Sequence, residues 1–140
     1  DEMQAALLRV KLRHLDTETQ RRREIAIAYA QGITNPKISL PIKNTNLSTN
    51  ALEHHAFHLF VIRTTQREKL QAYLSEHGIQ TMIHYPIAPH HQKAYENHQA
   101  WSNLSLPITE NIHQEVLSLP ISPVMSDVDV QQVIIAVNIF

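Results

Sequence analysis

The sequence predicts an α/β domain in which helices cover a small sheet of three or four short strands, with a long helix before the sheet. Three observations indicate this class. Residues 1–31 contain neither proline nor glycine and repeat apolar side chains at helical spacing. Residues 56–62 are rich in aromatic and branched apolar side chains, and residues 79–84 alternate as strands do. Residues 130–137 repeat valine and isoleucine at i, i+3, i+4 and i+7, which indicates a closing helix.

The first helix is predicted from residue 1 to about residue 31, entered partway along its pattern. Its stripe consists of Met3, Leu7, Val10 and His14. A continuous helix of this length extends roughly 45 Å at about 1.5 Å per residue, more than one small domain can cover. We therefore expect it to pack also on another domain or subunit, unless the polar run at 16–18 divides it. Gly32 and Pro36 end it, and residues 38–41 form a short extended segment.

A strand, helix and strand are predicted next. Residues 56–62 form the first strand. Thr65, with a glutamate three residues later, has the spacing of a capping box, and Gly78 suits the end of the helix that this box begins. Residues 79–84 form the second strand, with the odd-numbered side chains on one face and His84 on the other. Strand ends commonly carry ligand-binding residues, so this placement favours a functional role for His84.

The C-terminal part is predicted to contain a helix, an edge strand and a last helix. Pro107 suits the first turn of a helix, where its missing N–H costs nothing. The apolar stripe of that helix consists of Ile108, Ile112, Val116 and Leu119. Residues 118–121 are predicted as an edge strand, because sheets tolerate proline at their edges and Pro120 lies there. Ser126, with Asp129 three residues later, predicts the capped start of the last helix.

Composition narrows the classes of function. The 140 residues are 43% hydrophobic and 18% charged, the balance of a globular domain. A net charge of −1 gives no general attraction to nucleic acid or acidic lipid, and we expect neither as a partner. The sequence contains no membrane-length apolar run, no leader and no cysteine, so we expect a cytoplasmic protein. Its 2 glycines cannot assemble a loop that cradles phosphate.

The segment 84–92 is the strongest candidate site. Pro86 and Pro89 each fix φ at about −65°, which makes a stiff loop at the end of a predicted strand. The polar side chains of the loop are His84, Tyr85, His90 and Gln92. They suit hydroxyls, a carboxylate or a phosphate, and Tyr85 adds a flat face for a sugar or base. From the residues alone two alternatives stay open: a turn that only satisfies its own backbone, and a stand-alone domain that binds a small ligand.

Metal binding and covalent catalysis are not predicted. His54 and His58 would share one face of a strand and His55 the other, so the three do not converge. We therefore expect no metal site and interpret the 10 histidines as surface or half-buried groups. A protein that binds metal through its histidines stays open as an alternative, and metal retained after dialysis would support it. No lysine or serine has the neighbours of an activated nucleophile, so no catalytic residue is expected in this chain.

Several motifs follow one another in a recognisable order. They are residues 1–12, 21–26, 58–63, 78–81, the loop 84–92 with its His-Tyr-Pro start, and 115–120. Together they resemble the sugar-nucleotide aminotransferases of the DegT/DnrJ/EryC1/StrS family, over nearly the whole chain. The family pattern has a proline where Ala88 stands, and here Pro89 lies beside that position.

The resemblance implies a two-layer α+β fold with a mostly antiparallel sheet, like the small C-terminal domain of fold type I aminotransferases. It also implies an enzyme that uses pyridoxal 5′-phosphate and transfers an amino group from glutamate to a keto-6-deoxyhexose on dTDP. The 3-keto sugars are favoured, and the product is expected to enter cell-surface polysaccharide or lipopolysaccharide.

The resemblance further implies a homodimeric enzyme in which cofactor and substrate contacts come from different domains. The Schiff-base lysine and the cofactor contacts are expected in an N-terminal domain outside these residues. A connecting helix at 1–32 then leads into a small C-terminal domain at 33–140, which is inactive alone. The residues expected to contact the sugar nucleotide are His84, Tyr85, His90 and Gln92.

Overall fold

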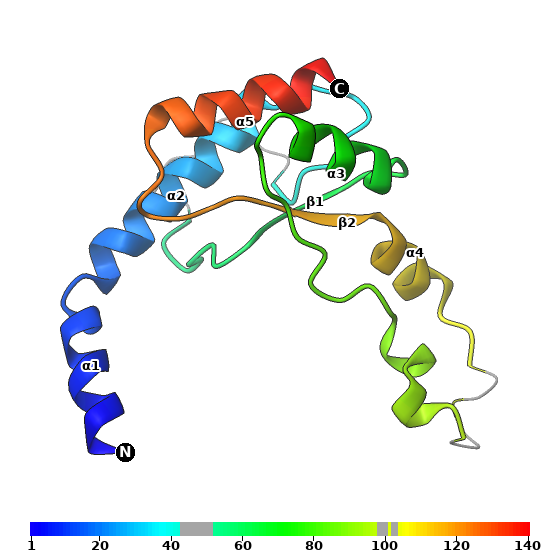
Figure 1. Ribbon diagram of the computed structural model, residues 1–140, viewed down its shortest axis with the longest axis horizontal. Helices are drawn as coiled ribbons and strands as arrows, with labels where there is room; N and C mark the ends of the chain where they lie inside the picture. The colour runs from blue at the N-terminus through cyan, green and yellow to red at the C-terminus, as the bar shows by residue number, and fades with distance from the viewer. Residues whose placement is uncertain (43–51, 98–100, 102–103) are drawn as a thin grey trace.

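The computed structural model describes residues 1–42, 52–97, 101 and 104–140. The elements in chain order are α1 (Glu2–Leu12), α2 (Leu15–Gly32), β1 (Phe60–Arg63), α3 (Arg67–Glu76), η2 (Pro89–His91), η3 (Lys93–Tyr95), α4 (Pro107–Glu115), β2 (Val116–Leu119) and α5 (Asp127–Ile139). Figure 1 shows α2, α3 and α5 gathered on one side of the strands, while α1 and the segment carrying η2, η3 and α4 project away from this body. Among the described residues, no helix has the length and apolar character needed to span a membrane.

The sheet is small and antiparallel throughout. Strands β1 and β2 pair with Phe60 opposite Leu119 and Arg63 opposite Val116. A single bridge extends each side, because Ser39 pairs with Arg63 and Met82 pairs with Ser118. The segments at 38–41 and 79–84 therefore flank β1 and β2, and the predicted class of a small antiparallel sheet covered by helices is confirmed.

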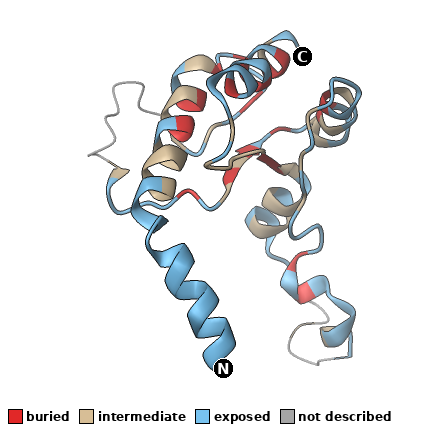
Figure 2. Ribbon diagram, turned by 60° about the vertical axis from the view of Figure 1, so that its left-hand side comes forward, coloured by how far each residue is buried: buried red, intermediate tan, exposed pale blue. Residues whose placement is uncertain are grey.

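The hydrophobic core lies between the sheet and the three covering helices. Tyr29 on α2 meets Phe60 on β1 edge to face, with ring centroids 5.1 Å apart. The Tyr29 hydroxyl donates to the Pro120 carbonyl at 2.7 Å, and burial raises the pKa of this phenol. The predicted apolar face of the last helix is buried here: Val130, Val133, Ile134 and Val137. Figure 2 shows buried positions concentrated in this body and α1 exposed along its length.

Helices α2 and α5 approach closely because α2 ends on a glycine. A Cβ atom at Gly32 would lie 2.9 Å from both Cδ1 and Cγ2 of Ile134, well inside normal contact. The Asn138 side chain then joins the two helix ends. Its oxygen accepts the N–H of Thr34 at 2.8 Å, and its nitrogen donates to the Gly32 carbonyl at 2.8 Å. These bonds satisfy backbone groups that the end of a helix leaves free.

The long N-terminal helix is divided into two. Helix α1 ends at Leu12 and α2 begins at Leu15, so the break lies at 13–14 rather than at the predicted 16–18. Helix α1 contains no buried residue. Helix α2 buries Ile25, Ala26, Tyr29 and Ala30 in the core. The second half of the predicted helix is thus part of the small domain's own packing.

Three local predictions are wrong. Thr65 does not cap α3, which begins at Arg67 after Gln66; instead the Thr64 hydroxyl accepts the Gln66 N–H at 3.2 Å. The segment 118–121 is not an edge strand, since β2 ends at Leu119 and lies between β1 and Met82. Its proline falls just after the strand and removes no sheet bond.

The third error concerns α4. Its helix ends at Glu115, so Val116 and Leu119, which the periodicity assigned to its stripe, belong to β2 instead. The strands predicted at 56–62 and 79–84 are also shorter than expected. The first is regularly paired only at 60–63, and the second has a single bridge at Met82.

The strongest chain-break and capping signals are confirmed. Gly78 follows α3 with φ of 73°, a conformation that side chains rarely adopt. Pro107 occupies the first turn of α4. Ser126 and Asp129 form both bonds of the capping box that begins α5.

Candidate substrate-binding site

The centre of the candidate site is the contact between His84 and Ser118. The segment 79–84 alternates between half-buried and exposed residues, which leaves the His84 side chain facing outward. Met82 and Ser118 exchange two backbone hydrogen bonds, at 3.2 and 2.9 Å, and so fix the distance between their chains. The Ser118 hydroxyl lies 3.0 Å from Nδ1 of His84. Because Nδ1 is engaged on the sheet side, the opposite ring nitrogen is the one available to a ligand.

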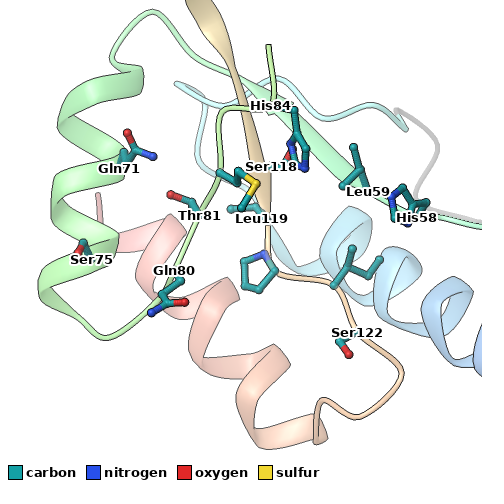
Figure 3. A pocket seen from close by; sticks show the side chains of 13 residues that line it. His58, Leu59, Gln71, Ser75, Gln80, Thr81, His84, Ser118, Leu119 and Ser122 are labelled. Carbon is teal, nitrogen blue, oxygen red and sulfur yellow. The ribbon is translucent and has the colours of Figure 1, made fainter. Parts of the chain in front are cut away.

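A groove with a volume of about 640 Å³ lies on one side of this pair. It is called the polar groove below because of its polar side chains, although its lining also includes Leu59, Met82, Leu119, Pro120 and Ile121. Its polar side chains are His58, Gln71, Ser75, Gln80, Thr81, His84, Ser118 and Ser122. Figure 3 shows that these groups come from the segment before β1, from α3 and the segment after it, and from β2 and the loop that follows it. Among the residues that the structure describes, no aspartate, glutamate, lysine or arginine lines the groove. Such neutral donors and acceptors suit the hydroxyl groups of a sugar better than an ion.

An apolar pocket of about 300 Å³ lies beside the same pair, between β1, β2 and α4. Its apolar lining consists of Leu59, Val61, Met82, Ile112 and Val116, joined by Tyr85 and His113. Both hollows are lined by Leu59, Met82, His84 and Ser118. His84 therefore borders a polar and an apolar surface at once, which is the usual composition of a small-molecule site.

The second predicted site residue, Tyr85, lies at the rim of the apolar pocket. Its side chain is 71% exposed, so its ring is accessible to a ligand. Its carbonyl lies 2.6 Å from Nδ1 of His113 on α4. This contact ties the start of the loop to α4, next to the pocket.

The other two predicted site residues lie elsewhere on the loop. His90 is buried, with Nε2 3.1 Å from Oε1 of Glu110 on α4. The same carboxylate oxygen accepts the Leu106 N–H at 2.7 Å. This bond and the His90 contact lower the pKa of Glu110. Gln92 is exposed. Neither His90 nor Gln92 lines the groove or the pocket, so the structure brings together His84 and Tyr85 only.

Three residues of this region were not identified from the sequence: Ser118, His113 and Glu110. Each meets the loop from a segment 20 to 34 residues further along the chain. Such contacts depend on the pairing of β2 with Met82, and no spacing in the sequence shows that pairing. The only local signal was Pro107, which marks the start of the helix that carries His113 and Glu110.

Pyridoxal phosphate, which the resemblance implies, does not fit the lysines that the structure describes. A Schiff-base lysine needs a desolvated amine within a pocket. Lys37 donates instead to the Phe140 carbonyl at 2.8 Å, and Lys11, Lys69 and Lys93 are exposed. None of these lysines lines the groove or the pocket beside His84. Lys43 lies outside the described residues.

Comparison with known proteins gives a consistent result. The family model described as the DegT/DnrJ/EryC1/StrS aminotransferase family matches residues 1–138. The dTDP-3-amino-3,6-dideoxy-alpha-D-galactopyranose transaminase of Aneurinibacillus thermoaerophilus is 53% identical, over 99% of this chain and 36% of that protein. The dTDP-3-amino-3,4,6-trideoxy-alpha-D-glucose transaminase of Streptomyces venezuelae is 41% identical, over 99% of this chain and 35% of that protein.

Solved structures agree with the sequence comparison. The crystal structure of S. venezuelae DesV in complex with a ketimine intermediate matches with a TM-score of 0.85 and 39% identity, over 99% of this chain and 36% of that one. The chain thus spans about a third of the length of the curated relatives it matches. Since the family model covers all but the last two residues, the chain belongs to the DegT/DnrJ/EryC1/StrS aminotransferase family.

Proposed function

We propose that this chain forms the sugar-binding part of a pyridoxal-phosphate-dependent aminotransferase that acts on a nucleotide-linked sugar. The observation that carries the proposal is the 53% identity, over 99% of the chain, with a transaminase named for a dTDP-3-amino sugar. A second relative at 41% identity is also named for a 3-amino sugar on dTDP. We infer the same class of substrate here: a dTDP-linked 3-keto-6-deoxyhexose that accepts its amino group from glutamate.

The surroundings of His84 support a role in holding the sugar. The polar groove offers amide, hydroxyl and imidazole groups of the kind that bind sugar hydroxyls. The exposed ring of Tyr85 offers a flat surface on which a sugar or base can stack. We therefore keep His84 and Tyr85 as the principal substrate contacts and His90 and Gln92 as weaker ones. Within the described part of the chain, the groove has no lysine or arginine to balance a diphosphate, so we assign that contact to the rest of the protein.

We also assign the cofactor chemistry to the part of the longer protein outside these 140 residues. Pyridoxal phosphate supplies the amino-group transfer when bound, through a lysine that none of the described lysines can replace. We propose residues 1–32 as the connection to this part and residues 33–140 as the small domain, although α2 also packs into the core of the latter. The exposure of α1 supports its role as a connection. Met3, Leu7 and Leu8 are 65 to 74% exposed, and we propose that the rest of the protein covers them. We further propose a cytoplasmic homodimer that provides an amino sugar for cell-surface polysaccharide or lipopolysaccharide.

The test compares the 140-residue chain with the longer protein that contains it. We expect the longer protein to bind pyridoxal phosphate and to convert a dTDP-3-keto-6-deoxyhexose with glutamate. The chain alone should neither acquire the cofactor's visible absorbance nor transfer nitrogen. In the longer protein, His84→Ala should raise the KM for the sugar nucleotide and leave the cofactor's absorbance unchanged.

His77→Ala is the matched control for the histidine variant. His77 is exposed, as His84 is, but it lies at the end of α3. Its Nδ1 contacts the Tyr73 carbonyl of that helix. An unchanged KM in His84→Ala would show that the sugar does not contact this residue. Saturable binding of a small ligand by the chain alone, with no amino transfer by the longer protein, would favour the stand-alone binding domain instead.

A further inference from the structure

We propose that His90, His91 and Glu110 form a binding site for a divalent transition-metal cation, with Zn²⁺ the best match. One ligand atom from each of the three side chains lies within 4.8 Å of the others. Two imidazoles and one carboxylate form a set that zinc enzymes use, with a remaining position left to water. Nitrogen donors also favour zinc and its neighbours in the periodic table over magnesium or calcium.

The distances are close to those that coordinated zinc requires. Zinc bonds of about 2.0–2.1 Å in a tetrahedral arrangement place two ligand atoms about 3.3 Å apart. Nε2 of His90 and Oε1 of Glu110 are already 3.1 Å apart. The rings of His90 and His91 are 4.1 Å apart between centroids and inclined by 51°. The three ligand atoms lie within 4.8 Å of one another, so zinc binding requires the exposed His91 side chain to turn closer to the other two.

The two backbone segments that carry the ligands are held in place. Pro89 begins the turn η2, and the His91 N–H donates to the Ala88 carbonyl at 2.9 Å. On α4 the Glu110 carboxylate accepts the Leu106 N–H at 2.7 Å, which fixes its orientation. Preorganised ligands lose little conformational entropy when a metal binds.

The state of His90 is a second and independent observation. Its side chain is 4% exposed, and Nδ1 is buried with no hydrogen-bond partner among the described residues. Buried polar atoms in proteins are normally paired, so an ion pair with Glu110 alone leaves this ring unsatisfied. In the proposed site Nε2 of His90 keeps its place beside Glu110, and the cation replaces the direct contact between the two side chains.

Access and charge also suit a cation. His91 is exposed and Glu110 is half-buried, so an ion can enter from solvent while His90 forms the inner wall. A glutamate side chain is an anionic ligand at neutral pH and balances part of the charge of the cation. Bound metal would join the turn η2 to α4 and so stiffen the loop that begins with His84 and Tyr85.

This cluster differs from the histidines that the sequence suggested. His54 and His58 lie close in sequence, but they were not expected to converge on a metal. The proposed cluster instead combines two adjacent histidines with a glutamate that lies 20 residues after His90, on a separate helix. Only the packing of the loop against α4 brings the three side chains together.

Zinc titration of the dialysed 140-residue chain, followed by calorimetry, tests the proposal. We expect one equivalent to bind, and Co²⁺ in its place to give the visible absorbance of a nitrogen-ligated site. His91→Ala and Glu110→Gln should each weaken binding at least tenfold. Neither change should disturb the fold, because His91 is exposed and glutamine can still accept the Leu106 N–H. Unchanged circular dichroism of both variants checks this point.

His54→Ala is the matched control, because this histidine is 95% exposed and lies outside the cluster. It should bind zinc as the unaltered chain does. The proposal is overturned if the unaltered chain binds no zinc, or if His91→Ala and Glu110→Gln keep full affinity. Loss of binding in His54→Ala alone would also overturn it, by assigning the metal to the other histidines.

Discussion

Replacing Ser118 with alanine tests how the sheet positions His84. Ser118 is 6% exposed and its hydroxyl lies 3.0 Å from Nδ1 of His84. Its backbone bonds to Met82 do not involve the side chain, so Ser118→Ala removes the hydroxyl and leaves the sheet intact. The His84 ring then loses the contact that selects its tautomer and orientation.

The magnitude follows from the loss of one neutral hydrogen bond. Such a bond contributes about 0.5–1.5 kcal/mol net, which corresponds to roughly 2- to 12-fold in affinity. His84 is exposed, so water can replace the hydroxyl and the free energy of unfolding should change by less than about 1 kcal/mol. In the longer enzyme that we propose, the KM for the sugar nucleotide should therefore rise by roughly 2- to 12-fold, with little change in thermal stability.

Two measurements distinguish positioning from a general structural effect. In a double-mutant cycle, Ser118→Ala should have no further effect on KM once His84 is alanine. In the 140-residue chain, nitrogen NMR of the His84 ring should show a changed tautomer balance in Ser118→Ala. Ser39→Ala is the matched control, because this serine also pairs with a neighbouring strand through its backbone but lines neither the groove nor the pocket. Additive effects on KM, or an unchanged His84 ring, would refute the role of Ser118.

Three further predictions concern the fold. Gly32→Ala should lower the free energy of unfolding in urea by about 1–3 kcal/mol, because the new Cβ meets Ile134. In an Ile134→Ala background the same change should not lower it further. An equal loss of stability in both backgrounds would contradict the steric argument. The pKa of Asp129 is lowered from 3.8 by hydrogen bonds from Ser126, so its contribution to stability is present above that pH and is lost as the pH falls further. Asp129→Asn should thus remove part of the acid dependence of unfolding, and a parallel acid profile would count against the capping box. Tyr29→Phe leaves the part-buried Pro120 carbonyl without its donor and should lower stability by about 1–2 kcal/mol, measured by thermal melting. A neutral result would show that water reaches this carbonyl.

The sequence was most informative where a signal acts over a few residues. The repeat in 130–137 predicted the buried face of α5, and Ser126 predicted its first residue, because helix period and capping depend only on neighbours along the chain. Gly78 was predicted for the same reason, as its positive φ is a property of one residue. These local rules place the helices that cover the sheet.

The sheet was predicted less well because its bonds join distant segments. Thr65 had the spacing of a cap, but the neighbouring Thr64 hydroxyl takes the backbone N–H that starts the turn before α3. Pro120 suggested an edge strand, whereas β2 stops one residue earlier and is paired on both sides. Propensity alone could not distinguish these outcomes, since both depend on which partner strand is present.

The same contrast between local and distant contacts explains which residues of the site could be predicted from the sequence. His84 and Tyr85 were predicted as substrate contacts on a stiff loop, and the structure places both beside one pocket. Whether they contact substrate stays a prediction. The groups that orient the loop come from β2 and α4, through Ser118, His113 and Glu110. A motif in the sequence can therefore identify side chains that border a pocket. The residues that hold those side chains in place require the fold, and variants of Ser118 and His113 should separate the two contributions.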